Sequence, residues 1–342
     1  MSEQLSERQR TILRYTIGDY IASATPVGSC AISRRHQLGL SPATIRNVMA
    51  DLEELGYINQ PHTSAGRMPT DKGYRFFVNE LLKLEEVSDS ERKTIVKTLE
   101  HTQEPEELLK EASRILGKIS HQLSLVSTPQ ISSAKFERLE LFNVSSTKIL
   151  VVLSVKSGIV KTIMMEVSSE VHREKLDEVS RILNERLSGL SLHQIRETFA
   201  TRVKDVKDDE TGIIRLLLSS KDRLFDDVLN WSHVHIGGTP EAMQQPEFED
   251  PKNFRAFLSL VDDEELMAQV VEKRDSKPGE ATVTIGQEHC EEKLRHYSIV
   301  TSVYKVGDVV GTVGIIGPKR MAYSKIIPLV DHMARTIASL LS

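Results

Sequence analysis

The chain has 342 residues, of which 39% are hydrophobic and 27% are charged, and its net charge is -5. This length is enough for two or three domains with separate cores, and the composition excludes disordered, collagen-like and coiled-coil chains. No apolar run approaches the roughly 18 residues of a membrane span. The N-terminal residues MSEQLSERQR also lack the basic-then-apolar order of a signal peptide, so we expect a cytoplasmic protein with no membrane partner.

The first 55 residues predict three short helices separated by tight turns. Ser6 and Gln9 form a capping-box pattern, and Thr25-Pro26 interrupts the apolar periodicity that follows it. Ser41 is a favourable N-cap with proline at the next position, and Gly56 ends the third apolar stripe. We expect helices over residues 7–22, 29–36 and 42–55.

A loop between two short strands follows the third helix. The first strand is expected around Tyr57 to Gln60, and the second begins at Arg67-Met68. Thr70 then caps another helix, expected over residues 71–84. Three helices followed by a two-stranded wing predict an N-terminal winged helix-turn-helix over residues 1–84.

The remaining chain predicts an α+β multidomain protein. The polar segment 84–92 is typical of a linker, and 93–121 has a long, irregular helical pattern. Three strand-like runs over 138–167 predict a meander, and the helical patterns after it end before a strand at 233–238. We therefore expect residues 131–231 to interrupt a second domain formed by 85–130 and 232–342. Further elements are expected at 122–128 (strand), 170–188, 191–199 and 211–230 (helices), 251–259 (helix), 281–285, 297–305 and 309–316 (strands), and in an amphipathic helix at the C-terminus.

The charge is distributed in a way that suits a DNA-facing surface. Residues 1–82 hold nine Lys/Arg against eight Asp/Glu, about +1, although the whole chain is acidic. Within them, 21–50 and 55–70 contain no carboxylate. These two stretches carry Arg34, Arg35, Arg46 and Arg67, and they form the predicted phosphate-facing surface.

The third helix of a winged helix enters the major groove, so its solvent-facing side chains are expected to contact bases. Arg46 suits guanine and Asn47 suits adenine, while Ala43 and Thr44 offer methyl groups to thymine. Ser41 starts the helix, where backbone N–H groups face a phosphate. The alternative is that this polar face is only solvated, as on many surface helices.

The wing and the helix after it supply the other predicted DNA contacts. The small residues and single arginine of the loop suit a segment that lies along a backbone or in a minor groove, although a plain hairpin turn is the alternative. Tyr74 follows the wing together with Lys72 and Arg75, and all three are expected to add phosphate contacts. The predicted contacts here are His62, Thr63, Ser64, Gly66, Arg67, Lys72 and Arg75.

The sequence contains no pattern that predicts an enzyme or a cofactor. The glycine-rich segment 311–319 matches neither a dinucleotide-binding nor a P-loop motif, and it lies in a strand pattern. His233 and His235 would share a face of a strand, but no third ligand completes a metal site. Cys30 and Cys290 are far apart without zinc or disulfide spacing, so we expect two buried thiols.

Two long segments carry a specific resemblance. LSERQRTILRYTIGDYIASATPVGS and SPATIRNVMADLEELGYINQPHTSAGRMPTDKGYRFFVNELL resemble the heat-inducible transcription repressor HrcA family, with PHTSAGR and ATIRNVMADLE as the most specific parts. IGQEH and GTVGIIGPKRMAYSKII are similar to later segments of that family. The sequence departs from the family pattern at Ala24-Thr25, Pro42, Met68, Lys319 and Ala322, and none of these removes a predicted DNA contact.

The resemblance implies a repressor of chaperone operons. It implies a winged helix, a GAF-like domain and an inserted dimerisation domain, with a homodimer bound to the CIRCE inverted repeat and kept active by the GroEL chaperonin. The first alternative is a regulator whose GAF-like domain senses a small molecule, since fold does not fix function. The second is an enzyme with the winged helix as an interaction module, which the missing catalytic constellation disfavours.

Overall fold

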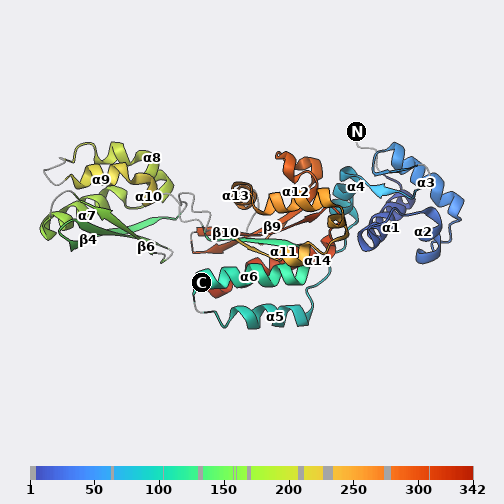
Figure 1. The fold of residues 1–342 in the computed structure, drawn as a ribbon, viewed down its shortest axis with the longest axis horizontal. Helices are drawn as coiled ribbons and strands as arrows, with labels where there is room; N and C mark the ends of the chain where they lie inside the picture. The colour runs from blue at the N-terminus through green and yellow to red at the C-terminus, as the bar shows by residue number, and fades with distance from the viewer. Residues whose placement is uncertain are drawn as a thin grey trace. The chain divides into compact units, whose positions relative to one another are not determined.

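The structure, a computed structural model, describes residues 5–62, 65–102, 104–129, 134–156, 158, 160–167, 171–206, 212–225, 234–272, 279–307 and 309–341. The chain divides into two compact units (Figure 1). The first unit comprises Met1–Ser127, Val234–Val303 and Thr312–Leu340, and the second comprises Thr128–His233, Tyr304–Gly311 and Leu341–Ser342. No helix in the described ranges is both long enough and apolar enough to cross a membrane.

The N-terminal part of the first unit is a winged helix, as predicted. The Ser6–Gln9 capping box is present, and the Ser41 hydroxyl accepts a hydrogen bond from the Thr44 N–H at 3.1 Å. Gly56 has φ +77°, the left-handed conformation that lets the chain turn after the third helix. The elements are α1 (Glu7–Ser23), α2 (Ser29–His36), α3 (Pro42–Glu54), β1 (Ile58–Asn59), β2 (Met68–Pro69), α4 (Asp71–Phe76) and the π-helical turn η1 (Phe77–Leu81).

The three helices pack around a small apolar core. Ile12 and Ile17 of α1, Ile32 of α2, and Ile45 and Leu52 of α3 are completely buried. Full burial of each such side chain contributes about 1.5–3 kcal/mol, so this core fixes which face of α3 remains outside. The helix expected over 71–84 is shorter, because it widens into η1 and ends at Leu81.

The rest of the first unit is built on a five-stranded sheet with the order β7-β3-β10-β9-β8. Its segment 93–121 is two helices, because Pro105 suits the first position of a new helix and separates them. The elements are α5 (Asp89–Leu99), α6 (Pro105–Ser120), β3 (Leu123–Ser127), β7 (Val234–Gly237), α11 (Thr239–Ala242), η4 (Pro246–Glu249), α12 (Pro251–Val261), α13 (Glu264–Glu272), β8 (Thr282–Ile285), η5 (Gly286–Glu288), η6 (Glu292–Leu294), β9 (Tyr297–Val306), β10 (Val309–Pro318) and α14 (Tyr323–Leu341).

Helices cover both faces of this sheet (Figure 1). Leu125 and Ile299 face α12 and α13 and share an apolar cluster with Phe257. On the opposite face, the Ser124 hydroxyl donates to the Ser113 carbonyl of α6, and the hydroxyls of Ser298 and Tyr323 on α14 are 2.6 Å apart. The first unit therefore contains a helix–sheet–helix sandwich next to the winged helix.

The second unit is an antiparallel meander with helices packed on it. The strands are in the order β4-β5-β6, and the Asn184 side chain on α7 bonds both backbone groups of Leu139 on β4. Along β5, Ile149, Val151 and Leu153 are buried, so one face of the sheet is covered. The elements are β4 (Phe136–Ser145), β5 (Lys148–Val155), β6 (Val160–Glu166), α7 (Arg173–Leu187), α8 (Leu192–Val203), α9 (Ile213–Ser219) and α10 (Lys221–Phe225).

The other face of the meander exposes apolar side chains. Phe142, Leu150 and Met164 are register partners and form one row across the three strands. Phe142 and Met164 are each 45% exposed, and Val144 and Val160 are more exposed still. An apolar sheet face of this kind is a feature of interaction surfaces.

Candidate nucleic-acid interface

The predicted base-contacting face of α3 is exposed. Ala43, Arg46 and Asn47 are exposed and Thr44 is half-buried, whereas Ile45 and Met49 on the opposite stripe lie in the core. Within the described residues, no hydrogen bond or ion pair is recorded for the side chains of Arg46 and Asn47. The first turn carries no acidic residue, so the positive end of the helix dipole is not offset there. Cation, amide and methyl groups are thus free to face a base edge.

The wing is held by backbone contacts on both sides. β1 and β2 pair through Ile58 with Pro69 and Asn59 with Met68. Val27, between α1 and α2, exchanges two backbone hydrogen bonds with Arg67, at 2.9 and 2.8 Å. His62 is exposed at the start of the loop, and Thr63 and Ser64 lie outside the described residues. The base of the wing is consequently tied to the helical core.

Gly66 is required by this close approach. A Cβ atom at Gly66 would lie 2.5 Å from the Val27 carbonyl carbon, which is backbone and has little room to move. Gly66 is predicted from the sequence to contact DNA, and its close packing on Val27 is a separate constraint on this position. That DNA contact stays a prediction.

Arg67 forms an ion pair with a residue of α3. Its Nη2 lies 2.9 Å from Oε2 of Glu53 near the end of α3, and the Arg67 side chain is only 18% exposed. The structure therefore places Arg67 between the wing and α3. Its predicted contact with DNA stays a prediction, and its partner Glu53 was not predicted from the sequence.

The two arginines of α2 differ in their surroundings. Both are exposed, but Arg35 lies 3.3 Å from Asp19, whereas no ion pair is recorded for Arg34 within the described chain. Asp19 on α1 is 9% exposed and also lies 2.9 Å from Nε2 of His36. The Asp19 carboxylate therefore joins the end of α2 to α1. The one signal of this role in the sequence is a charged residue within the apolar stripe of α1.

Lys72 and Arg75 on α4 are both engaged within the protein. The Lys72 ammonium donates to the Leu55 carbonyl at 2.7 Å, at the C-terminal end of α3, where a cation is favourable. Arg75 binds Glu288 and the Val283 carbonyl of the sheet part. Tyr74, expected to add a phosphate contact, is only 2% exposed and its ring packs near Tyr323, so that expectation is wrong.

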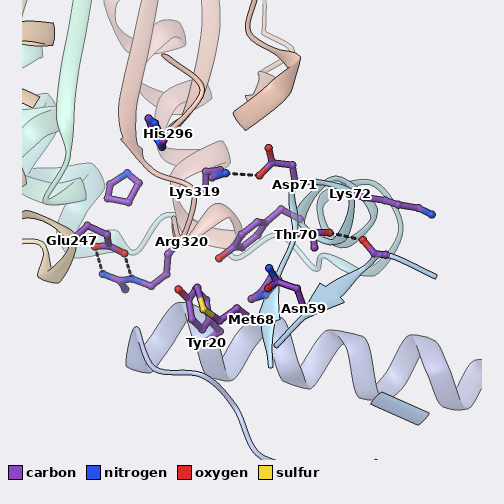
Figure 2. Close-up of a pocket in the computed structure, with 14 residues that line it drawn as sticks. Tyr20, Asn59, Met68, Thr70, Asp71, Lys72, Glu247, His296, Lys319 and Arg320 are labelled. Carbon is purple, nitrogen blue, oxygen red and sulfur yellow. Dashed lines mark hydrogen bonds and ion pairs between the residues drawn. The ribbon is translucent and has the colours of Figure 1, made fainter. Parts of the chain in front are cut away.

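A cavity of about 580 Å³ lies beside α4 within the first unit (Figure 2). Lys319 points at Asp71, with 2.6 Å between Nζ and Oδ1, and Arg320 points at Glu247, with 2.7 Å between Nε and Oε1. Burial raises the pKa of Tyr20, which lines the cavity, and the negative charge of Glu247 raises it further. The charged groups of this cavity largely neutralise one another.

The two histidines and the two cysteines are the other candidate residues from the sequence. His233 lies outside the described residues and His235 is half-buried in β7. Within the described ranges, no group of three His, Cys, Asp or Glu side chains is placed to hold a metal ion. Both Cys30 and Cys290 are exposed, so the expectation of two buried thiols is wrong.

Comparisons with known proteins agree with this geometry. The family described as "Winged helix-turn-helix transcription repressor, HrcA DNA-binding" matches residues 4–83, and "HrcA protein C terminal domain" matches 106–327. The chain is 41% identical to the heat-inducible transcription repressor HrcA of Chlorobium phaeobacteroides (strain BS1), with all of both chains covered. It is 42% identical to that of Chlorobium chlorochromatii (strain CaD3), over 99% of this chain and 98% of the relative.

A crystal structure of a hypothetical protein has a similar fold. Its TM-score is 0.56 at 24% identity, with 99% of each chain covered. The winged helix, the two family matches and the full-length relatives lead to one assignment. The chain belongs to the HrcA family.

Proposed function

We propose that this protein is a cytoplasmic, heat-inducible transcription repressor that binds the CIRCE inverted repeat in front of chaperone operons. The exposed face of α3 carries the proposal, because Arg46, Asn47 and Ala43 face solvent while the opposite stripe forms the core. Such a helix reads base edges in the major groove. The names of the relatives support repression and heat induction.

The active form in this proposal is a homodimer. An inverted repeat presents two identical half-sites, which a protein with two-fold symmetry matches. The row Phe142–Leu150–Met164 supports dimerisation through the meander, because isologous pairing of two such faces would remove these side chains from water. We assign residues 131–231 as the dimerisation domain and 85–130 with 232–342 as a GAF-like domain.

GroEL is the proposed partner that keeps the repressor active. A multidomain chain with an exposed apolar sheet face populates aggregation-prone states before it dimerises, and a chaperonin rescues such states. When heat fills GroEL with unfolded clients, less repressor reaches its DNA-binding form. Repression then lapses.

The alternative is a regulator controlled by a small molecule. The cavity beside α4 favours this reading to a limited extent, since about 580 Å³ falls in the range of ligand pockets. Lys319 and Arg320 in its lining are already paired with carboxylates, so a ligand that binds them would have to displace Asp71 or Glu247. A thermal-shift screen with metabolites tests it: a ligand that raises the melting temperature and changes operator affinity would favour the alternative.

The decisive experiment compares a CIRCE duplex with a scrambled duplex at two salt concentrations, with and without GroEL. Phosphate contacts weaken as salt rises, whereas the preference for one sequence reflects base contacts. A preference for CIRCE that GroEL strengthens supports the proposal. Equal, weak binding to both duplexes in all conditions would overturn it.

A further inference from the structure

Helix α4, directly after the wing, is held by the segment that contains the IGQEH motif. The Asp71 carboxylate accepts a hydrogen bond from the Gln287 backbone N–H at 2.9 Å. Arg75 donates from Nε to Glu288 at 2.7 Å and from Nη2 to the Val283 carbonyl at 2.6 Å. The start and the end of α4 are thus bound to the same segment of the sheet part.

The GPKR motif supplies the other contacts. Lys319 pairs with Asp71 at 2.6 Å (Figure 2), and Arg320 donates to the Ile21 carbonyl at the end of α1 at 2.7 Å. Arg320 also binds Glu247, and its side chain is only 11% exposed. The two C-terminal motifs therefore bind both α4 and α1 of the winged helix.

The fit leaves no space at the centre of this contact. A Cβ atom at Gly286, which has φ +54°, would lie 2.1 Å from Oδ2 of Asp71. Any side chain at Gly286 would therefore displace the Asp71 carboxylate. Glycine at this position is what permits the close approach.

The donors of Arg75 are nearly all used in this contact. Glu288 accepts from Nε and Nη2, Val283 accepts from Nη2, and Asn79 accepts from Nη1 at 3.3 Å. A guanidinium has five N–H donors, so these four contacts leave little to offer a phosphate. A planar, bidentate pair of this kind fixes orientation as well as distance.

We propose that Asp71 and Arg75 are positioning residues, which fix the winged helix on the sheet part through the IGQEH and GPKR motifs. They act on DNA binding through the orientation of α3 and the wing and make no phosphate contact. This inference rests on the proposed operator binding, and it replaces the sequence-based interpretation of Arg75 as a phosphate contact.

The slope of log affinity against log salt separates the two roles. Loss of a phosphate contact lowers that slope by about 0.9, whereas loss of a positioning contact leaves it unchanged. The variants are R75A and G286A, which break the contact from opposite sides. G279A is the control for backbone strain, because Gly279 also has positive φ and its Cβ position lies only at an ordinary contact distance of 3.8 Å from the flexible Arg335 side chain. Thermal melting checks that each variant folds.

We expect R75A and G286A to weaken CIRCE binding by about two- to thirtyfold, the usual range for residues that couple sites, with the wild-type salt slope. G279A retains wild-type affinity. Pairing R75E with E288R recovers part of the loss, because the ion pair is restored although the bond to Val283 is not.

Two results would overturn the inference. One is a salt slope lowered by about 0.9 in R75A with wild-type affinity in G286A, which would make Arg75 a phosphate contact. The other is tighter binding and a steeper slope in E288Q, which would mean that Glu288 withholds Arg75 from DNA. If the wild type shows no CIRCE preference, the proposed function fails, and hydrogen exchange still tests the contact. The α4 amides exchange faster in G286A than in G279A if Asp71 holds the helix.

Discussion

Arg67 of the wing and Glu53 of α3 form an ion pair, with 2.9 Å between Nη2 and Oε2. The wing therefore has a side-chain attachment to α3 in addition to its backbone pairing with Val27. Because the two side chains are only 18% and 34% exposed, solvent screens this pair less than most surface pairs. We therefore expect this charge pair to help set the angle between α3 and the wing.

A double-mutant cycle measures this attachment. We expect E53Q, R67Q and the double variant to give a coupling energy of about 1 kcal/mol in chemical denaturation, near the upper end for a partly exposed pair. CIRCE affinity is expected to fall in E53Q, although Glu53 is a carboxylate that DNA would repel. Additive single-variant effects, or tighter binding by E53Q, would show that the pair does not position the wing.

Gly66→Ala is expected to destabilise the winged helix by about 1–3 kcal/mol, because its Cβ would collide with the Val27 backbone. Gly18→Ala is the matched control: Gly18 is inside α1 with nothing within 4 Å of its Cβ position, so alanine should stabilise by up to about 1 kcal/mol. Thermal melting followed by circular dichroism compares them. Equal melting temperatures in the two variants would contradict the packing argument.

Arg46→Ala and Asn47→Ala are each expected to cost about 1–3 kcal/mol of CIRCE binding and to relax sequence preference. Both side chains are exposed on α3, so the fold should be unaffected. Binding titrations on CIRCE and scrambled duplexes measure the change, with the exposed Lys110→Ala on α6 as a control. Equal losses on the two duplexes would assign these residues to the phosphate backbone.

Phe142→Asp with Met164→Asp is expected to give a monomer, because the two changes place charge in the apolar row of the meander. Sedimentation velocity measures the oligomeric state, and specific CIRCE binding should fall with it. Leu84→Asp is the control, since Leu84 is 59% exposed and belongs to the first unit, whereas the meander belongs to the second. A dimer that survives both substitutions would place the interface elsewhere.

His332 on α14 is expected to make the stability of the protein depend on pH. Burial lowers the pKa of its imidazole below 6.5, and the positive charges of Arg92 and Arg335 lower it further. The unfolded chain therefore binds this proton more readily, so stability present above about pH 6.5 is lost as the pH falls. In urea denaturation, the free energy of unfolding should fall less between about pH 7 and about pH 5 in His332→Gln than in the wild type. His62→Gln, at an exposed site, is the control and is expected to behave like the wild type. If His332→Gln loses as much unfolding free energy as the wild type over this pH range, His332 is not the group responsible.

The local signals in the sequence were sufficient for the winged helix. Ser6, Ser41 and Thr70 cap helices where predicted, since capping depends on residues three or four positions apart. The contacts of Arg75 could not be predicted in this way, because its partner Glu288 is 213 positions away. Cationic side chains after a wing suit both a phosphate and a carboxylate, and only the fold distinguishes the two.

The same limit explains the other differences. Tyr74 was interpreted from its neighbours Lys72 and Arg75, but the packing of α4 buries it. Cys30 was expected to be buried on the general behaviour of cysteine, yet it lies on the outer side of α2. The helix Glu264–Glu272 was not predicted, although Leu266, Met267, Val270 and Val271 do recur at helical spacing in a short segment.

Ser127 and Val234 are register partners at the ends of β3 and β7. The chain thus leaves the five-stranded sheet and returns to it across a single pair of neighbouring strands, a gap of about 5 Å that an ordinary hairpin turn would also span. The intervening hundred or so residues are, topologically, the enlarged loop of one hairpin. Deleting or lengthening them would leave the strand order of the sheet unchanged, so the meander and its helices can vary in length without altering the sheet from which they branch.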